Sequence, residues 1–210
     1  MRAAYWDGRY PAGWAGGGEA TRDALQAAGY TILNADELKT WMNARIADKN
    51  LSVMVFCRDL APDTVAETMS ANCTLRKYLD AGGKIVWCGD VPFWFQGHAD
   101  GTNTSWDVAG APAILGFNPC GGAGDSHQVV TLTPDGIEWG LTQTWQSLRP
   151  AAPGFTSNVT ILATDAGGNP AGWVKHYLTG DTYRGFVRFR DTDGQPLVAD
   201  LMRVAEYAGQ

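Results

Sequence analysis

The chain has 210 residues, which is enough for one domain with a sizeable hydrophobic core. Hydrophobic residues make up 45% of it and charged residues 18%, a composition typical of folded globular proteins and not of disordered ones. The formal net charge of −6 argues against a nucleic-acid partner, because nucleic-acid binders normally carry a basic surface.

Apolar runs in the chain fall short of the ~18–20 residues of a membrane span, and the N-terminus lacks the apolar core of a signal peptide. Four cysteines are widely spaced and form no Cys-x-x-Cys pair, which favours free thiols over a disulfide framework or a zinc site. We therefore expect a soluble cytoplasmic protein with no membrane partner, no metal and no cofactor.

Residues 1–95 alternate strand-like and helix-like patterns, which predicts a parallel sheet with helical crossovers. The run 51–56 is almost continuously apolar, as expected for a strand covered on both faces. Asn34 or Asp36 is placed to cap the second helix. The predicted strands are 2–6, 30–33, 51–56 and 84–87; the predicted helices are 19–28, 37–47 and a segment that follows Asp63 and ends at Asp80.

Residues beyond 95 have a different pattern, in which short strand-like runs are separated by turns and predict antiparallel hairpins. These strands are 160–164, 171–177 and 184–190, after a helix at 106–115, a loop at 116–124, a short strand at 128–132 and an irregular segment at 137–150, and before a helix at 200–207. The predicted fold class is α/β: a flavodoxin-like, mainly parallel sheet flanked by helices, with antiparallel strands added in the C-terminal third. One domain, 1–210, accounts for all of it.

Acidic residues follow three of the predicted parallel strands. Asp7, Asp59 and Asp90 come directly after the first, third and fourth strands, and Arg58 precedes Asp59. Ligands of open α/β sheets bind beyond the carboxyl ends of the strands, so these side chains are expected to share one edge. Asp7 and Asp90 are candidate catalytic acids or bases, and Arg58 and Asp59 are candidate ligand contacts. The alternative is that the carboxylates cap helices or brace loops.

Aromatic side chains surround the same predicted edge. Trp6, Trp94 and Trp106 are candidate ligand contacts, because flat aromatic faces beside carboxylates suit the C–H faces and hydroxyls of a sugar ring. The same residues can equally build an aromatic core under a loop. The Gly-rich segments 13–18 and 121–124 match no phosphate-binding motif and are interpreted as loops or lids. His98 with Asp100, and Asp125 with His127, each offer two metal ligands, which is too few to define a site.

Cys88 directly follows the predicted strand 84–87 and is a third candidate catalytic residue. A nucleophilic thiol needs a base or a positive field, and the nearby Asp90 would disfavour the thiolate. The alternative interpretation is a small buried residue at a strand end.

Several phrases resemble the class I glutamine amidotransferase-like superfamily, in particular its ThuA-like branch and the related domain of β-galactosidases. These phrases are LRKYLDAGGKIVW at 75–87, AILGF at 113–117, ILATD and PAGWVKHY within 161–177, and RGFVRFRD at 184–191. The resemblance implies the α/β fold already predicted. The β-galactosidase relatives imply a role as an interaction or oligomerisation domain.

The catalytic pattern of that superfamily is not matched residue by residue. Its enzymes carry Cys in a Gly-x-Cys-x-Gly turn, whereas Val86 and Asp90 flank Cys88 at the glycine positions here. They also carry His-x-Glu near the C-terminus, whereas His176 is followed by Tyr-Leu. ThuA-like members have histidines at two loop positions, where this chain has GFNPC at 116–120 and Arg-Asp at 190–191.

Three functions remain open from the sequence, and it does not decide whether the protein is an enzyme. The first is binding or processing of a small polar, carbohydrate-like molecule at the carboxyl edge of the sheet. The second is a non-catalytic interaction domain that forms a homo-oligomer. The third is a hydrolase that uses Cys88 as its nucleophile.

Overall fold

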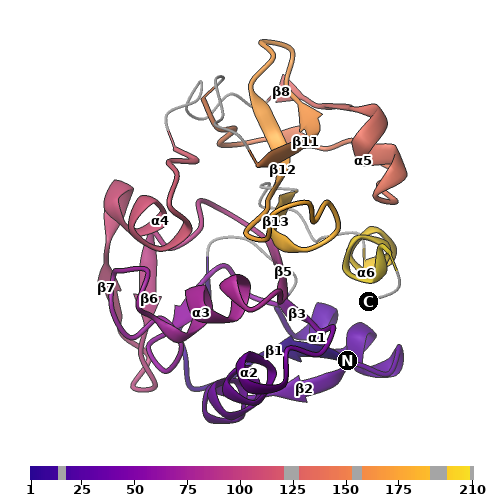
Figure 1. The fold of residues 1–210 in the computed structure, drawn as a ribbon. Helices are drawn as coiled ribbons and strands as arrows, with labels where there is room; N and C mark the ends of the chain where they lie inside the picture. Colours follow the sequence, from indigo (N-terminus) through magenta and orange to yellow (C-terminus); the bar gives the residue numbers. More distant parts are fainter. Residues whose placement is uncertain (14–17, 121–127, 153–157, 190–197, 209–210) are drawn as a thin grey trace.

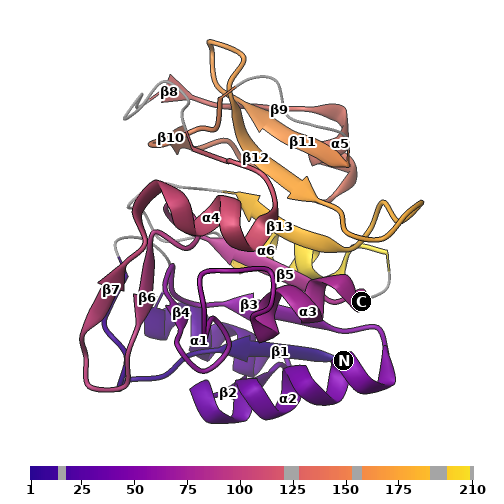
Figure 2. The same ribbon diagram turned by 60° about the vertical axis from the view of Figure 1, so that its left-hand side comes forward.

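A computed structural model describes residues 1–13, 18–120, 128–152, 158–189 and 198–208. Its centre is an eight-stranded sheet with the order β2-β1-β3-β5-β13-β12-β11-β9 (Figures 1 and 2). The strands, in that order, are Thr31–Leu33, Arg2–Tyr5, Val53–Phe56, Lys84–Cys88, Gly185–Phe189, Pro170–Lys175, Val159–Thr164 and Thr131–Leu132.

The first five strands of this order, from β2 to β13, are parallel, and the last three are joined antiparallel. The parallel part has the strand order of flavodoxin-like folds, so the predicted fold class is confirmed. One pairing was not predicted: β13, a hairpin partner of β12, also pairs in parallel with β5, with Val187 opposite Val86. A single strand therefore joins the parallel and antiparallel parts.

Helices cover both faces of the parallel part (Figure 2). Side chains alternate along β5, so that Trp87 packs in one hydrophobic cluster and Val86 in the other. The first cluster lies under α2 (Ala35–Asp48), α3 (Thr74–Asp80) and α4 (Asp107–Leu115). The second lies under α1 (Gly18–Ala27) and α6 (Val198–Glu206), while the short α5 (Pro134–Glu138) packs on β11.

The second helix begins with a capping box at Asn34, not at Asp36. The Asn34 side chain accepts hydrogen bonds from the N–H groups of Asp36 and Glu37, and the Glu37 carboxylate accepts one from the N–H of Asn34. Three backbone donors that the helix leaves without partners are thereby satisfied, which sets the start of α2 at Ala35.

The predicted helix between Asp63 and Asp80 is wrong in its first half, because α3 begins only at Thr74. Residues 63–73 form turns, in which Val65 and Ala66 donate to the carbonyl of Pro62. The Glu67 carboxylate accepts hydrogen bonds from the N–H and hydroxyl of Thr74. A side chain from the turn region thus serves the first turn of the helix, and the chain is not helical before it.

Two small sheets were not predicted. One contains β4 (Ala61–Pro62), β6 (Phe95–Gly97) and β7 (Asn103–Ser105), and the other pairs β8 (Gln128–Val129) with β10 (Gln146–Ser147). The predicted strand 128–132 is therefore two strands, β8 and β9, in different sheets. The segment 137–150, predicted to be irregular, contains the end of α5 and β10. The Gly-rich stretches 14–17 and 121–124 lie outside the described residues.

Candidate functional site

A cavity of about 530 Å³ opens beyond the carboxyl ends of β3 and β5. Asp59 reaches it from the loop after β3, and Asp90 from the loop after β5. This is the edge at which ligands of open α/β sheets bind, and the volume is in the range of small-molecule sites. The lining residues are Asp59, Asp90, Val91, Trp94, Phe95, Leu148 and Arg149.

Two glycines make room for the carboxylate of Asp59. A Cβ atom at Gly13 would lie 1.3 Å from Oδ1 of Asp59, and one at Gly89 would lie 2.4 Å from its Cβ. Gly89 also has φ +155°, a conformation that side chains other than glycine rarely adopt. The backbone N–H of Asp90 donates to Oδ2 of Asp59 at 3.3 Å, so the two acidic residues are in direct contact.

Asp90 is buried and bonded on both carboxylate oxygens. Oδ1 accepts from the N–H of Val91 at 2.7 Å, and Oδ2 forms an ion pair with the guanidinium of Arg149. The Asp90 side chain is 9% exposed and that of Arg149 is 40% exposed, so the arginine forms the solvent side of the pair. The fully buried Arg188, on β13, donates to the carbonyl of Arg149 at 3.0 Å and holds this segment against the sheet.

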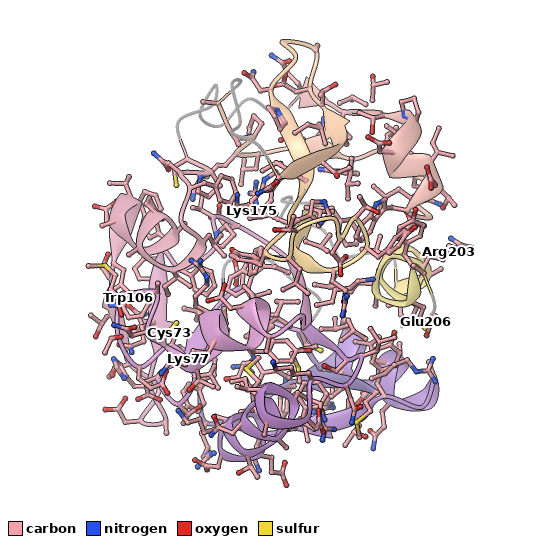
Figure 3. The ribbon with its side chains drawn as sticks, in the orientation of Figure 1. Cys73, Lys77, Trp106, Lys175, Arg203 and Glu206 are labelled. Carbon is pink, nitrogen blue, oxygen red and sulfur yellow. The ribbon has the colours of Figure 1, made fainter. Side chains whose placement is uncertain are left out.

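Residues at the start of α4 hold the aromatic side of the cavity in place. The carbonyl of Trp94 accepts hydrogen bonds from the N–H groups of Trp106 and Asp107, at 2.8 and 3.1 Å. Phe93 is fully buried with φ +59°, and a Cβ at Gly110 would lie 2.0 Å from its carbonyl oxygen. Trp106 itself packs on the first hydrophobic cluster beside β7 and α4 (Figure 3). Trp106 therefore supports Trp94 and does not itself line the cavity.

Asp7 follows β1 at the same edge but is not among the cavity residues. Its carboxylate accepts hydrogen bonds from the backbone and guanidinium of Arg9 and from the N–H of Ala35, at 2.7–3.2 Å. Burial alone would raise the pKa of Asp7, but the hydrogen bonds from Arg9 and Ala35 outweigh it and lower the pKa below its usual value. Asp7 is therefore a brace: its hydrogen bonds tie the first loop to the start of α2.

Arg58 and Trp6 form a separate cluster. The guanidinium carbons of Arg22 and Arg58 lie 4.2 and 5.2 Å from the centre of the Trp6 ring. Arg58 also donates to the carbonyls of Tyr10 and Pro11. Cation–π stacking and these hydrogen bonds tie the first loop to the loop after β3, and neither residue lines the cavity.

The thiol hypothesis gains no base from the described histidines. The side chain of Cys88 lies outside the described residues, although its backbone ends β5 opposite Phe189. His176 follows Lys175, which pairs with Phe186 near the other end of β13, so it lies toward the opposite edge of the sheet. His98 is bonded to Asp63. Burial raises the pKa of the Cys57 thiol to about 12, which leaves that residue protonated and inert at neutral pH.

Within the described part of the chain, no group of three or more His, Cys, Asp or Glu side chains is placed to hold a metal ion. The predicted pair His98 and Asp100 does not converge: His98 contacts Asp63 and Thr104, whereas Asp100 accepts from Thr102. Asp125 and His127 lie outside the described residues. None of the helices in the described segments is long and apolar enough to cross a membrane.

Sequence reasoning missed Leu148, Arg149 and Arg188. Arg149 lies in a stretch without a motif and meets Asp90 only because β10 and the following segment fold over the sheet edge. Arg188 did leave a signal, since it is a lone arginine within the otherwise apolar strand Gly185–Phe189. A buried charge of this kind needs partners at a strand end, and such positions are candidates for a site.

The fold is shared with a solved structure. The "Cytoplasmic Protein STM3548 from Salmonella typhimurium" aligns with 91% of this chain and 86% of its own, with a TM-score of 0.55 and 12% sequence identity. At this identity the likeness shows an α/β architecture in common and nothing of function.

Sequence comparison identifies the family to which the chain belongs. A family described as the MJECL34 family matches residues 2–202, and the chain belongs to that family. A relative, "Uncharacterized protein MJECL34" of Methanocaldococcus jannaschii, is 30% identical over 166 residues, which cover 75% of this chain and 55% of that protein. The matched region therefore spans little more than half the length of this relative.

Proposed function

We propose that this chain binds a small polar, carbohydrate-like molecule in the cavity beyond β3 and β5. The observation that carries the proposal is that the carboxylates of Asp59 and Asp90 and the ring of Trp94 line one cavity at the sheet edge. Carboxylates accept hydrogen bonds from hydroxyl groups, and an indole face packs against the C–H face of a sugar ring. A volume of about 530 Å³ accommodates a monosaccharide.

The Asp90–Arg149 ion pair at the solvent side of the cavity suggests which sugars bind most tightly. Arg149 is the partner of Asp90 and the more exposed of the two. A guanidinium binds a carboxylate in two parallel hydrogen bonds, so an acidic sugar can engage Arg149 while its hydroxyls contact Asp59. A neutral sugar has no carboxylate to make these hydrogen bonds. Sugar acids are therefore expected to bind more tightly than neutral sugars.

A thermal-shift screen of neutral sugars, sugar acids, amino acids, nucleotides and divalent metals tests the proposal. A ligand at ~100 times its dissociation constant stabilises the folded state by about 2.7 kcal/mol, which is readily measured. We expect a stabilising sugar or sugar acid, with the shift lost in Asp90→Asn and Trp94→Ala. Arg149→Gln should weaken sugar acids more than neutral sugars.

Asp23→Asn is the matched control, because Asp23 is an exposed carboxylate paired with Arg22 on α1 and lies outside the cavity. It should leave every ligand shift unchanged. A well-folded protein that no sugar stabilises, or a shift that survives both Asp90→Asn and Trp94→Ala, would contradict the proposal.

The two other hypotheses have less support. An oligomer interface built on aromatic side chains needs them exposed, but among the large hydrophobic residues described as exposed only Tyr183 is aromatic. Hydrolysis at Cys88 gains no support, because His176 lies toward the opposite edge of the sheet and His98 is bonded to Asp63 and Thr104. A cytoplasmic location, which the Salmonella neighbour carries in its name, is likewise proposed here and agrees with the free thiols.

A further inference from the structure

Asp63, His98 and Thr104 form a continuous hydrogen-bonded chain on the small sheet β4-β6-β7. Nδ1 of His98 lies 2.9 Å from Oδ2 of Asp63, and Nε2 of His98 lies 2.8 Å from Oγ1 of Thr104. The order is carboxylate, imidazole, hydroxyl. This is the arrangement by which enzymes activate a hydroxyl nucleophile: the base contacts the hydroxyl and a third group orients the base.

The strand pairing explains why these three residues meet. Pro62 on β4 is opposite Gly97 on β6, so the next residues, Asp63 and His98, emerge side by side. On the other side β6 pairs antiparallel with β7, and His98 is diagonal to Thr104. The three side chains thus come from β7 and from the residues directly after β4 and β6, and the register of one sheet holds them together.

The carboxylate is anchored independently of the histidine. Oδ1 of Asp63 accepts a hydrogen bond from the hydroxyl of Tyr10 at 2.8 Å, and the N–H of Asp63 donates to the carbonyl of Gly97 at 3.0 Å. In the tautomer of His98 that carries its proton on Nδ1, facing Asp63, Nε2 is the acceptor for the hydroxyl proton of Thr104.

A backbone donor stands next to the hydroxyl. β7 is the outer strand of its sheet, at the left of Figure 1. The N–H of Trp106 bonds to the carbonyl of Trp94 and that of His98 to Thr102, so hydrogen-bonded pairs recur at every second residue. The N–H of Ser105 therefore points away from β6, directly after Thr104. Thr104 is exposed, so a substrate can reach both groups.

We propose that Thr104, His98 and Asp63 form a second, hydrolytic site that cleaves small carboxylic esters. Thr104 and Ser105 lie on alternate faces of β7, and Ser105 is paired with Phe95, a cavity residue. The triad consequently lies on the face of the small sheet opposite Phe95. It does not depend on a ligand in the cavity.

The reaction proceeds in two balanced steps. Oγ1 of Thr104 attacks the ester carbonyl carbon while its proton moves to Nε2 of His98, and the N–H of Ser105 donates to the developing oxyanion. The carbon–oxygen ester bond breaks, the alcohol leaves with the proton from His98, and Thr104 is acylated. Water then attacks the acyl-Thr104 carbonyl and gives its proton to His98, which releases the carboxylic acid and restores the hydroxyl. Asp63 is a positioning residue that keeps Nε2 free of its proton between steps.

p-Nitrophenyl acetate is the probe that tests this site, with release of p-nitrophenolate followed by absorbance and acetylated peptides identified by mass spectrometry. The wild type should form an acetyl adduct on the peptide that contains Thr104. Thr104→Ala should abolish that adduct, and Thr104→Ser should retain it. His98→Ala should lower kcat by about 100-fold or more, as expected for loss of a general base. Asp63→Asn should lower kcat with little change in KM.

Thr102→Ala is the matched control, because Thr102 is a threonine of the same hairpin whose hydroxyl bonds to Asp100 and not to His98. It should hydrolyse the ester at the wild-type rate, and circular dichroism of all variants should be superimposable. Equal rates in the wild type and in Thr104→Ala would overturn the proposal, because they would mean that an imidazole or amine acts alone. So would acetylation confined to lysines, since Thr104 would then be merely a tie between β6 and β7.

Discussion

Two acidic residues at the same sheet edge have different surroundings. Asp7 follows β1 and is bonded entirely within its neighbourhood, to Arg9 and to the start of α2. Asp90 follows β5 and faces a cavity, where its ion-pair partner Arg149 is the more exposed member. Position after a parallel strand is common to both, so position alone does not define a site. A brace and a ligand-binding group differ in the partners of the side chain and in whether a cavity lies beside it.

The largest effect is expected from Gly89→Ala, which places a side chain between the two acidic loops. The new Cβ would lie 2.4 Å from that of Asp59 at φ +155°. Strain and the clash together should lower the free energy of unfolding by about 3 kcal/mol, and the cavity should lose its ligand. Urea unfolding measures the first effect. A nearly unchanged midpoint would show that the loops after β3 and β5 move apart readily.

Asp7→Ala should have the next largest effect on stability. It removes the acceptor for the N–H of Ala35 and leaves the guanidinium of Arg9 with the exposed Asp36 as its described carboxylate partner. We expect a loss of about 2 kcal/mol in urea unfolding, with ligand shifts of the remaining folded protein unchanged. If Asp7→Ala instead abolished ligand binding without any loss of stability, Asp7 would belong to the binding site.

The contribution of Asp7 to the stability of the folded protein should depend on pH. The pKa of Asp7 is lowered in the folded state, so its stabilising contribution is complete above the ordinary carboxyl pKa and is lost as pH falls through the lowered one. Urea midpoints between pH 3 and pH 6 should fall less steeply in Asp7→Asn than in the wild type. Parallel curves would show that other carboxylates dominate acid unfolding.

Asp90→Asn should have the smallest effect on stability and the largest on the cavity. The amide oxygen still accepts from the N–H of Val91, and the lost ion pair involves a partly exposed arginine, so the change should stay within about 1 kcal/mol. Ligand binding should disappear, as described above. A larger loss of stability would place Asp90 with Asp7 among the braces.

Much of the sheet edge could be read from the sequence. The apolar run that becomes β3 and the Gly-Gly stop before β5 predicted the strands, and their ends predicted where Asp59 and Asp90 lie. For Asp7 the sequence left a catalytic and a bracing interpretation open, and its Oδ1 accepts from the N–H two residues later, as in an Asx turn. The late start of α3 could not be read, because the hydrogen bonds of the Glu67 carboxylate to Thr74 leave no pattern in the sequence.

The alternation of buried strands and amphipathic helices, and hence the parallel core, follows from the residue pattern, because periodicity is a local property of the chain. Which polar groups meet depends instead on how the whole chain folds. Arg149 reaches Asp90 across 59 positions, and Asp63 reaches His98 across 35. Such pairs depend on strand register and on how loops cross the sheet edge. Both are settled by packing of the whole chain, which no short stretch of residues encodes.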